Sequence, residues 1–239
     1  MREGVGQKEG AYIYIAKMPS FMPDEIICPP KRKSEIDAAA REQRKKELYY
    51  GWKLLEYGAM DAFGISPAKG DGGHREDGSV CFDGLFCSLS HSGNLIAAAL
   101  SQQNVGVDVE RFARGSSVRK AAGHFLTETE KAGAPPETEE EAFQNWLIRR
   151  WTEKESVFKR DGGTYFDPRM IETGSERNRL WGMTLVVADG RYHVSAAFAR
   201  EETAPAVLIA ESAGLSFEKM NREKEKIPLF PENGSCYNI

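Results

Sequence analysis

The stretch that decides the fold is NVGVDVERF, residues 104–112. In a β-strand, alternate side chains point to opposite faces of the sheet. The three valines would therefore share one face, while Gly106, Asp108 and Glu110 would share the other. An apolar face indicates packing against a core, so the two carboxylates on the second face need an explanation of their own.

Composition and charge narrow the class of protein. The chain has 239 residues, 41% of them hydrophobic, which is enough for one large domain or for two lobes with a core each. A net charge of −4 gives no reason to expect a nucleic-acid partner, although basic residues cluster over 31–46. No apolar run approaches the roughly 20 residues that cross a bilayer, and the start of the chain lacks the apolar stretch of a signal peptide. The four cysteines have no metal-ligand spacing, so we expect reduced thiols and a cytoplasmic protein without membrane contact.

The predicted elements fall into two halves of similar order. In the first half we expect a strand over 11–17 and a long helix from Ser34 to about Phe63. Ser34 and Asp37 are arranged as a capping box, and Gly64 marks the end of the helix. A glycine-rich loop and three short strands follow, with the sequences LFCSLS, LIAAALS and VGVDVER.

The second half repeats this order with helices before strands. Helical segments are expected over 116–124, 127–132 and 138–160, and strands over 181–189, 191–200 and 205–212. The tail is charged and broken by proline and glycine, which favours a surface appendage. We therefore predict an N-terminal lobe over 1–112, a C-terminal lobe over 113–216 and an appendage over 217–239.

A second informative stretch is WLIRRWTEKESVFKR, residues 146–160. On a helix, Trp151, Lys154, Glu155 and Phe158 share one face, so two charges lie within an aromatic stripe. A glutamate drawn to the apolar side is paired, protonated or bound to a cation, because an unpaired buried charge is too costly. The alternative is that Lys154 and Glu155 only border the stripe and extend towards solvent.

Together the two stretches outline a site for a hard cation. Asp108, Glu110 and Glu155 lie on two elements that a compact fold could bring face to face. Because Mg²⁺ binds carboxylates together with water and phosphate oxygens, such a site predicts a phosphate-bearing ligand. Lys154 and Lys159 add positive charge beside it.

A third stretch, FCSLSHSGN at 86–94, places Ser90, His91 and Ser92 at the end of a short apolar strand. Hydroxyls, an imidazole and backbone N–H groups at a turn suit a phosphate. A histidine at a strand end can equally be structural or simply exposed. Adjacent serine and histidine do not form a hydrolase triad, since neighbours along a strand face apart and there is no G-x-S-x-G motif.

In this order and spacing, the three stretches resemble the signature of the 4′-phosphopantetheinyl transferase superfamily, in its large two-lobed monomeric type. There, an (I/V)G(I/V)D block is followed, after some forty residues, by an aromatic residue, a small residue, a variable position, Lys-Glu and a downstream lysine. Here the residues 109–150 separate Asp108 from Trp151, which opens the stretch WTEKESVFK. The block SLSHS lies upstream as in the family, and HFLTETEKAG at 124–133 is similar to the family's intervening segment.

The resemblance implies a fold and a reaction. The fold would be two similar α+β lobes, each a small antiparallel sheet with a long helix, related by a pseudo-twofold axis and with coenzyme A at their junction. The reaction would be the Mg²⁺-dependent transfer of the 4′-phosphopantetheine arm of coenzyme A to a serine of an acyl or peptidyl carrier protein, with release of 3′,5′-ADP. By resemblance, Asp108, Glu110 and Glu155 would hold Mg²⁺, and Glu155 would take the proton of the serine.

The resemblance also implies roles for basic residues. Lys154 and Lys159 would balance phosphate charge, so that Lys154 joins Asp108 and Glu155 in the catalytic set. Ser90 and His91 would bind the 3′-phosphate of coenzyme A.

The first-lobe contacts depart from the family pattern. Family members commonly carry a Gly-Lys-Pro element ahead of the SHS block, whereas this chain reads GGHREDGSV there. Arg75, or else His74, would replace that lysine. Arg44 is our choice for a contact to adenine or phosphate, with Arg41 and Lys45 as competitors.

Two other functions stay open. One is a different Mg²⁺-dependent phosphotransferase or nucleotide hydrolase, although the chain has no Walker A loop and no kinase motif set. The other is a non-catalytic module that binds coenzyme A or a carrier protein. Three carboxylates beside two lysines favour a working enzyme, which we expect to be a monomer.

Overall fold

The computed structural model of the chain describes residues 10–65, 73–74, 80–82, 84–112, 117–199, 205–213, 216–219 and 236–238. The first elements are β1 (Tyr12–Lys17), α1 (Pro30–Ala38), α2 (Glu42–Phe63), β2 (Gly73–His74), β3 (Val80–Phe82), β4 (Leu85–Ser92) and β5 (Leu95–Ser101). There follow β6 (Val105–Arg111), α3 (Ser117–Phe125), α4 (Glu128–Ala132), α5 (Glu140–Asp161) and the 3-10 helix η2 (Pro168–Met170). The last elements are β7 (Arg179–Val187), β8 (Gly190–Phe198), β9 (Ala206–Ala213), β10 (Ser216–Lys219) and β11 (Cys236–Asn238).

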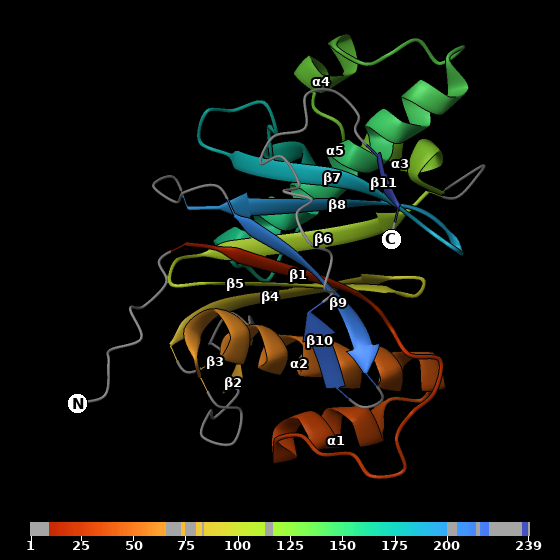
Figure 1. Cartoon of the computed structure of the whole chain (residues 1–239). Helices are drawn as coiled ribbons and strands as arrows, with labels where there is room; N and C mark the ends of the chain where they lie inside the picture. Colours follow the sequence, from red (N-terminus) through yellow and green to blue (C-terminus); the bar gives the residue numbers. More distant parts are fainter. Residues whose placement is uncertain are drawn as a thin grey trace.

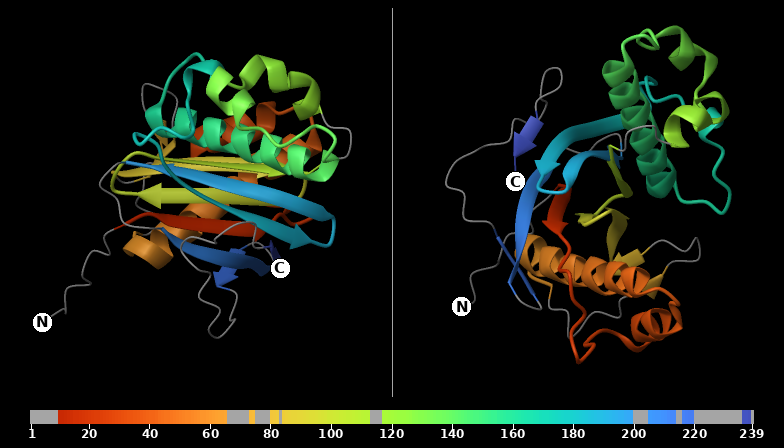
Figure 2. Two further views of the ribbon diagram at one scale, coloured as in Figure 1. Left: turned by 90° about the horizontal axis from the view of Figure 1, so that it is seen from above. Right: turned by 90° about the vertical axis from the view of Figure 1, so that its right-hand side faces the viewer.

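The strands form two sheets, which confirms the predicted α+β class. Sheet A has the order β10-β9-β1-β5-β4-β3-β2, and sheet B has the order β11-β7-β8-β6. Most neighbours are antiparallel, but β9 runs parallel to β1 and β11 runs parallel to β7. The helices α1 and α2 lie at the sheet A end of the molecule, and α3, α4 and α5 lie at the sheet B end (Figure 1; Figure 2 gives two further views).

The boundary between the sheets differs from the predicted lobe boundary at residue 112. Strand β6 pairs with β8 in sheet B, although only residues 102–104 separate it from β5 in sheet A. Conversely, β9 and β10 follow the C-terminal elements in sequence but pair into sheet A beside β1. Each sheet therefore combines strands from both predicted lobes, because strand pairing depends on residues far apart in sequence.

Two of the three hydrophobic cores among the described residues involve the sheets. One core lies between sheet A and α2 and contains Tyr14, Trp52 and Leu100. The other lies between the sheets and contains Ile13 of β1 together with the three valines of β6. The apolar face of β6 thus packs in a core, as predicted, and its second face packs against α5.

The long helix predicted from Ser34 to Phe63 is two helices. Helix α1 begins at Pro30, whose ring favours the first helical position, and the backbone turns extended before α2 begins at Glu42. No side chain caps the start of α1, so the capping box predicted at Ser34 is wrong. Gly64 ends α2 in the left-handed conformation at φ 67°, as predicted. Within the described ranges, no helix is both long enough and apolar enough to cross a bilayer.

Candidate active site

The second face of β6 meets the helix α5 at a cluster of charged side chains. Asp108 is buried, and its Oδ1 lies 2.7 Å from Nζ of Lys159. Nζ of Lys159 also lies 4.0 Å from Oε2 of Glu155, one helical turn earlier. Glu110 follows Asp108 by two residues on the same face of the strand. We call Asp108, Glu110 and Glu155 the carboxylate cluster; the structure brings these three predicted residues and Lys159 together.

Burial and the repulsion between negative charges raise the pKa of two acids of the carboxylate cluster. Burial, followed by the negative charge of Asp108, raises the pKa of Glu155 to about 7. Burial and the same charge also raise the pKa of Glu110. Lys159 opposes both shifts but does not cancel them. A further cation among these oxygens would therefore be attracted.

The donor set is consistent with a hard cation, but the side chains as they stand do not form a ligand cage. In the part of the chain that the structure describes, no group of three or more His, Cys, Asp and Glu side chains is arranged to hold a metal ion. Lys159 supplies positive charge at this place instead. Oδ2 of Asp108 is nevertheless buried without a hydrogen-bond partner, which is costly unless a ligand satisfies it. Carboxylate oxygens are the ligands that Mg²⁺ prefers, so this orphaned oxygen fits the predicted metal.

Strand β4 presents its two faces to different neighbours. Leu85 and Cys87 pack in the core against α2, whereas the hydroxyl of Ser90 reaches the carboxylate cluster. Ser90 Oγ donates to Asp108 Oδ1 at 2.7 Å, and Ser92 Oγ donates to Glu110 Oε2 at 3.0 Å. Ser90 and its neighbour His91 face opposite sides of β4, as adjacent strand residues do. The phosphate contact predicted for both stays a prediction.

His91 lies on the opposite face of β4, beside α2. Its Nε2 lies 2.9 Å from Nη1 of Arg44 and 3.3 Å from Oε2 of Glu47. Burial, opposed in part by Glu47, lowers the pKa of His91, so the neutral ring accepts a hydrogen bond from Arg44. The structure thus joins His91 to the helix residue chosen from the sequence, while the competitor Lys45 pairs with Glu42.

The other predicted first-lobe residue cannot be placed. Arg75 lies outside the described residues, and of His74 only the backbone in β2 is described. Glu47 was missed by the sequence analysis, since an acid on a helix face carries no signal of its own.

Lys154 is placed elsewhere than the sequence predicted. Its side chain is fully buried, and Nζ lies 2.8 Å from Oε2 of Glu130. It also donates to the backbone oxygens of Pro168 and Ile171. An ammonium group has three donors, and all three are used here. Lys154 therefore joins α5 to α4 and to the following loop, and it does not face the carboxylate cluster.

Gly106 explains why the strand and helix come so close, a role that the sequence analysis missed. A Cβ at this position would lie 1.9 Å from the backbone oxygen of Ser156 in α5. Only glycine permits this approach. The close contact brings Glu155 and Lys159 to the second face of β6.

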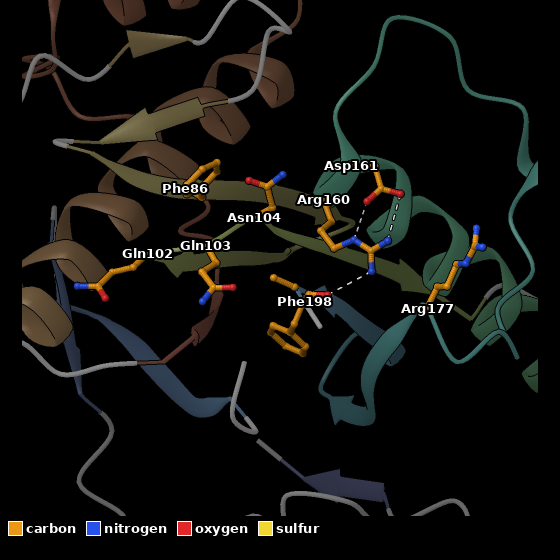
Figure 3. A pocket seen from close by; sticks show the side chains of 9 residues that line it. Phe86, Gln102, Gln103, Asn104, Arg160, Asp161, Arg177 and Phe198 are labelled. Atoms are coloured by element: carbon orange, nitrogen blue, oxygen red, sulfur yellow. Dashed lines mark hydrogen bonds and ion pairs between the residues drawn. The ribbon is translucent and has the colours of Figure 1, made fainter. Parts of the chain in front are cut away.

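A surface pocket of about 480 Å³ lies at the other end of β6. It is lined mainly by Phe86, Gln103, Asn104, Arg160 and Phe198, and Figure 3 shows these side chains around it. The guanidinium of Arg160 donates to the carboxylate of Asp161 and to the backbone oxygen of Phe198 (Figure 3). None of the described residues that line this pocket belongs to the predicted site.

Carboxylates on a sheet's edge strand, facing a lysine and a third carboxylate on a long helix, form a site suited to phosphate chemistry. Comparison with known proteins agrees: residues 104–199 match the family model of the 4′-phosphopantetheinyl transferase superfamily. This range includes β6 and α5, so the resemblance to this superfamily is confirmed. Enterobactin synthase component D of Salmonella typhi is 26% identical over 144 residues, covering 59% of this chain and 57% of that protein. The chain thus spans little more than half the length of that relative.

Proposed function

We propose that this protein transfers the 4′-phosphopantetheine arm of coenzyme A to a serine of an acyl or peptidyl carrier protein. The carrier is converted from its apo to its holo form, and 3′,5′-ADP is released. The serine oxygen forms a bond to the phosphorus that carries pantetheine, the bond from this phosphorus to the bridging oxygen breaks, and ADP leaves with that oxygen. In such phosphoryl transfers, catalysis consists mostly of positioning and charge neutralisation.

The observation that carries the proposal is the convergence of Asp108, Glu155 and Lys159 from β6 and α5. All three lie within the segment that matches the superfamily. Phosphoryl groups need positive charge near the transferred phosphorus and an acceptor for the nucleophile's proton. Lys159 offers the charge, and the half-buried Glu155 offers the acceptor, within one turn of the same helix.

The residues divide the chemical work between them. Glu155 accepts the proton of the carrier serine, directly or through one water molecule. Lys159 stays within reach of both acids and turns its ammonium group to a phosphate oxygen when the substrate arrives. Arg44 and His91 provide donors on the α2 side of β4 for the 3′-phosphate of coenzyme A. We do not keep Lys154 in the catalytic set, because its donors are used within the fold.

We further propose that Asp108, Glu110 and Glu155 hold Mg²⁺. When bound, the ion would neutralise charge on the pyrophosphate of coenzyme A. The partnerless Oδ2 of Asp108 and the raised pKa of Glu110 support this assignment. Ser90 and Ser92 keep two of the acids oriented towards the same place.

The cellular setting follows the same proposal. The protein would act as a monomer in the cytoplasm, where carrier proteins and coenzyme A are its partners. Cys28 and Cys81 are free thiols, which suits a reducing compartment.

The decisive experiment measures the intact mass of an apo carrier protein after incubation with coenzyme A, Mg²⁺ and this protein. We expect the mass of one phosphopantetheine to be gained, with 3′,5′-ADP as co-product. A non-catalytic binding module would leave the mass unchanged, and another phosphotransferase would add phosphate alone or release a different nucleotide.

The variant Asp108→Ala connects this reaction to the carboxylate cluster. It should abolish transfer at saturating coenzyme A and leave the circular dichroism spectrum unchanged, because it removes a cation ligand without burying a new charge. The control Asp37→Ala removes an exposed acid from α1 and should retain full activity. Transfer by Asp108→Ala at about a tenth of the wild-type rate or faster would contradict the assignment, since losing such a group typically costs more than this.

A further inference from the structure

Three serines of β4 form regularly spaced contacts with the neighbouring strand β6. Oγ of Ser88 accepts from the N–H of Val107 at 3.0 Å, and Oγ of Ser90 accepts from the N–H of Val109 at 3.3 Å. The third contact joins Oγ of Ser92 to the N–H of Arg111 at 3.1 Å. We call these three side chains, Ser88, Ser90 and Ser92, the serine ladder.

The serine ladder spans the join between the two sheets. Strand β4 belongs to sheet A, and β6 is the edge strand of sheet B. In an antiparallel edge strand, every second N–H points away from its neighbour. Phe112 donates its N–H to the backbone oxygen of Arg191 in β8, so the N–H groups at odd positions along β6 point outward. The ladder supplies acceptors for these otherwise unpaired groups, whose burial without partners would be costly.

Two of the three serines do a second task with the same hydroxyl. A serine oxygen that accepts an N–H still has one proton to donate. Ser90 donates it to Asp108 at 2.7 Å, and Ser92 donates it to Glu110 at 3.0 Å. No carboxylate contact of Ser88 is found among the described residues. Ser90 and Ser92 therefore each contact both the backbone of β6 and one acid of the carboxylate cluster.

We propose that the serine ladder sets the register of β6 against sheet A and that Ser90 and Ser92 are positioning residues for the carboxylate cluster. The inference rests on the proposed function only in its second half, where the acids bind a divalent cation. A hydroxyl whose oxygen accepts a backbone N–H has fewer directions left in which to donate its proton. The orientation of Asp108 and Glu110 is thus set by sheet A, across the join, and not only by their own strand.

The register half is tested by amide hydrogen exchange in the full chain, measured by NMR. Ser88→Ala should speed exchange at Val107, and Ser92→Ala should speed exchange at Arg111, each by about tenfold or more, as expected when a protecting hydrogen bond is lost. Exchange at the other amides of β6 should stay close to wild type. Unchanged exchange at both cognate amides would overturn the ladder, independently of any enzymatic activity.

The positioning half is tested by Mn²⁺ binding, followed by electron paramagnetic resonance without coenzyme A or carrier. Ser92→Ala should weaken Mn²⁺ binding by about tenfold or more, as is typical when a residue that orients a metal ligand is removed. Ser92→Thr keeps the hydroxyl and should restore wild-type binding. Ser88→Ala is the matched control, since it removes an equivalent backbone contact but no contact to an acid, and it should leave Mn²⁺ affinity within about twofold.

These measurements separate the ladder from the proposed transferase function. If Ser92→Ala and Ser88→Ala bind Mn²⁺ as tightly as wild type, positioning by the ladder is wrong even when carrier protein is modified normally. If Ser92→Ala and Ser88→Ala weaken Mn²⁺ binding equally, the serines only stabilise the contact between β4 and β6. The positioning role is then wrong as well. If carrier protein is not modified but Ser92→Ala alone weakens Mn²⁺ binding, the proposed function fails and the ladder stands.

Discussion

Gly106 of β6 lies so close to α5 that a Cβ at this position would be 1.9 Å from the backbone oxygen of Ser156. It would also lie 2.5 Å from the backbone nitrogen of Arg160. These are backbone atoms of a helix, so they cannot swing aside as a flexible side chain could. The glycine in the VGVD motif therefore sets the distance between the strand that carries Asp108 and the helix that carries Glu155.

We expect Gly106→Ala to push α5 away from β6. Overpacking of a core typically costs about 1–3 kcal/mol, and a contact with helix backbone should reach or exceed the top of that range. Urea unfolding measures the loss, and transfer activity should fall with it because Glu155 moves from Asp108. The control Gly123→Ala adds the same methyl group to α3 in open space and should be neutral or stabilise by about 0.5–1 kcal/mol. Equal effects of the two substitutions would contradict the packing role.

Lys154 should matter for stability before it matters for catalysis. Burial would raise the pKa of Glu130, but its hydrogen bonds with Lys154, Thr127 and Thr173 together lower it. Removing one partner of a buried pair typically costs about 3–5 kcal/mol, so Lys154→Met should lower the free energy of unfolding by this amount. The double variant Lys154→Met with Glu130→Gln should recover part of the loss.

An exposed pair provides the control for Lys154. Nζ of Lys131 lies 2.6 Å from Oε1 of Glu128 on α4, and the side chain of Glu128 is almost fully exposed. Lys131→Met should therefore cost well under about 1 kcal/mol. A Lys154→Met protein that is as stable as wild type but has lost affinity for coenzyme A would instead support the phosphate contact predicted from the sequence.

Glu155→Gln tests the proton acceptor. The amide keeps the size of the side chain but cannot take a proton, so kcat should fall by at least about 100-fold, the usual loss for a missing general base. Steady-state kinetics over a range of Mg²⁺ concentrations measures the change. The control Glu176→Gln alters an exposed acid in the loop before β7 and should not affect kcat. An unchanged kcat with a raised Mg²⁺ requirement would make Glu155 a metal ligand only.

His91 and Arg44 should sense the 3′-phosphate of coenzyme A. With full coenzyme A, His91→Ala or Arg44→Ala should cost about 1.5–3 kcal/mol in kcat/KM, the range for a hydrogen bond to a charged group. Dephospho-coenzyme A lacks the contacted phosphate. With this substrate the same substitutions should therefore lower kcat/KM only slightly. Lys45→Ala, which removes a lysine paired with Glu42, is the control and should act equally weakly on both substrates. Equal losses by His91→Ala with the two substrates would assign this histidine a structural role.

His193 should make the protein less stable in acid. This ring is buried on β8, its Nδ1 lies 3.2 Å from Oγ1 of Thr184, and its Nε2 has no hydrogen-bond partner. Burial, followed by the positive charges of Arg149 and Arg150, lowers the pKa of His193 to about 3. The unfolded chain takes up this proton near the ordinary value of 6.5, so the unfolded state binds more protons between the two values. The free energy of unfolding is therefore not reduced by this ring well above pH 6.5, and it decreases as the pH falls from 6.5 towards 3.

Urea unfolding at several pH values checks this expectation. Between about pH 6 and 4, wild type should lose up to about 1.4 kcal/mol per pH unit more than His193→Gln, which cannot be protonated. His124→Gln, on the exposed side of α3, should show the pH dependence of wild type. Parallel pH curves for wild type and His193→Gln would show that the buried ring does not contribute.

Much of the candidate site follows from local pattern. The alternation in VGVDVER predicts a strand with a core face and an acidic face, and the spacing of WTEKESVFK predicts a helix face that mixes aromatic and charged residues. Both elements exist as predicted, and Lys159 lies near an acid from each of them. Such features are readable because the periods of strands and helices are properties of the backbone alone.

What the sequence left open depends on contacts between distant residues. Ser90 and His91 are neighbours in the same motif, yet one reaches Asp108 on β6 and the other reaches Arg44 on α2. Lys154 and Glu155 are neighbours on α5, and the helix turns them about 100° apart, so that one meets Glu130 and the other lies near Lys159. The period of a strand or a helix determines that adjacent side chains point in different directions. It does not determine which residues each side chain contacts.

The sequence by itself thus determined the strand and the helix that carry the site, the acids of the carboxylate cluster and the resemblance to the superfamily, because these depend on residues close together in the chain or on motif spacing. Only the tertiary structure decided that β6 joins sheet B, that β9 returns to sheet A and that Lys154 is a buried partner of Glu130. Pairing of strands and burial of charges are decided by which surfaces meet in the folded chain. They depend on the free energy of the whole arrangement, which no single stretch of sequence contains.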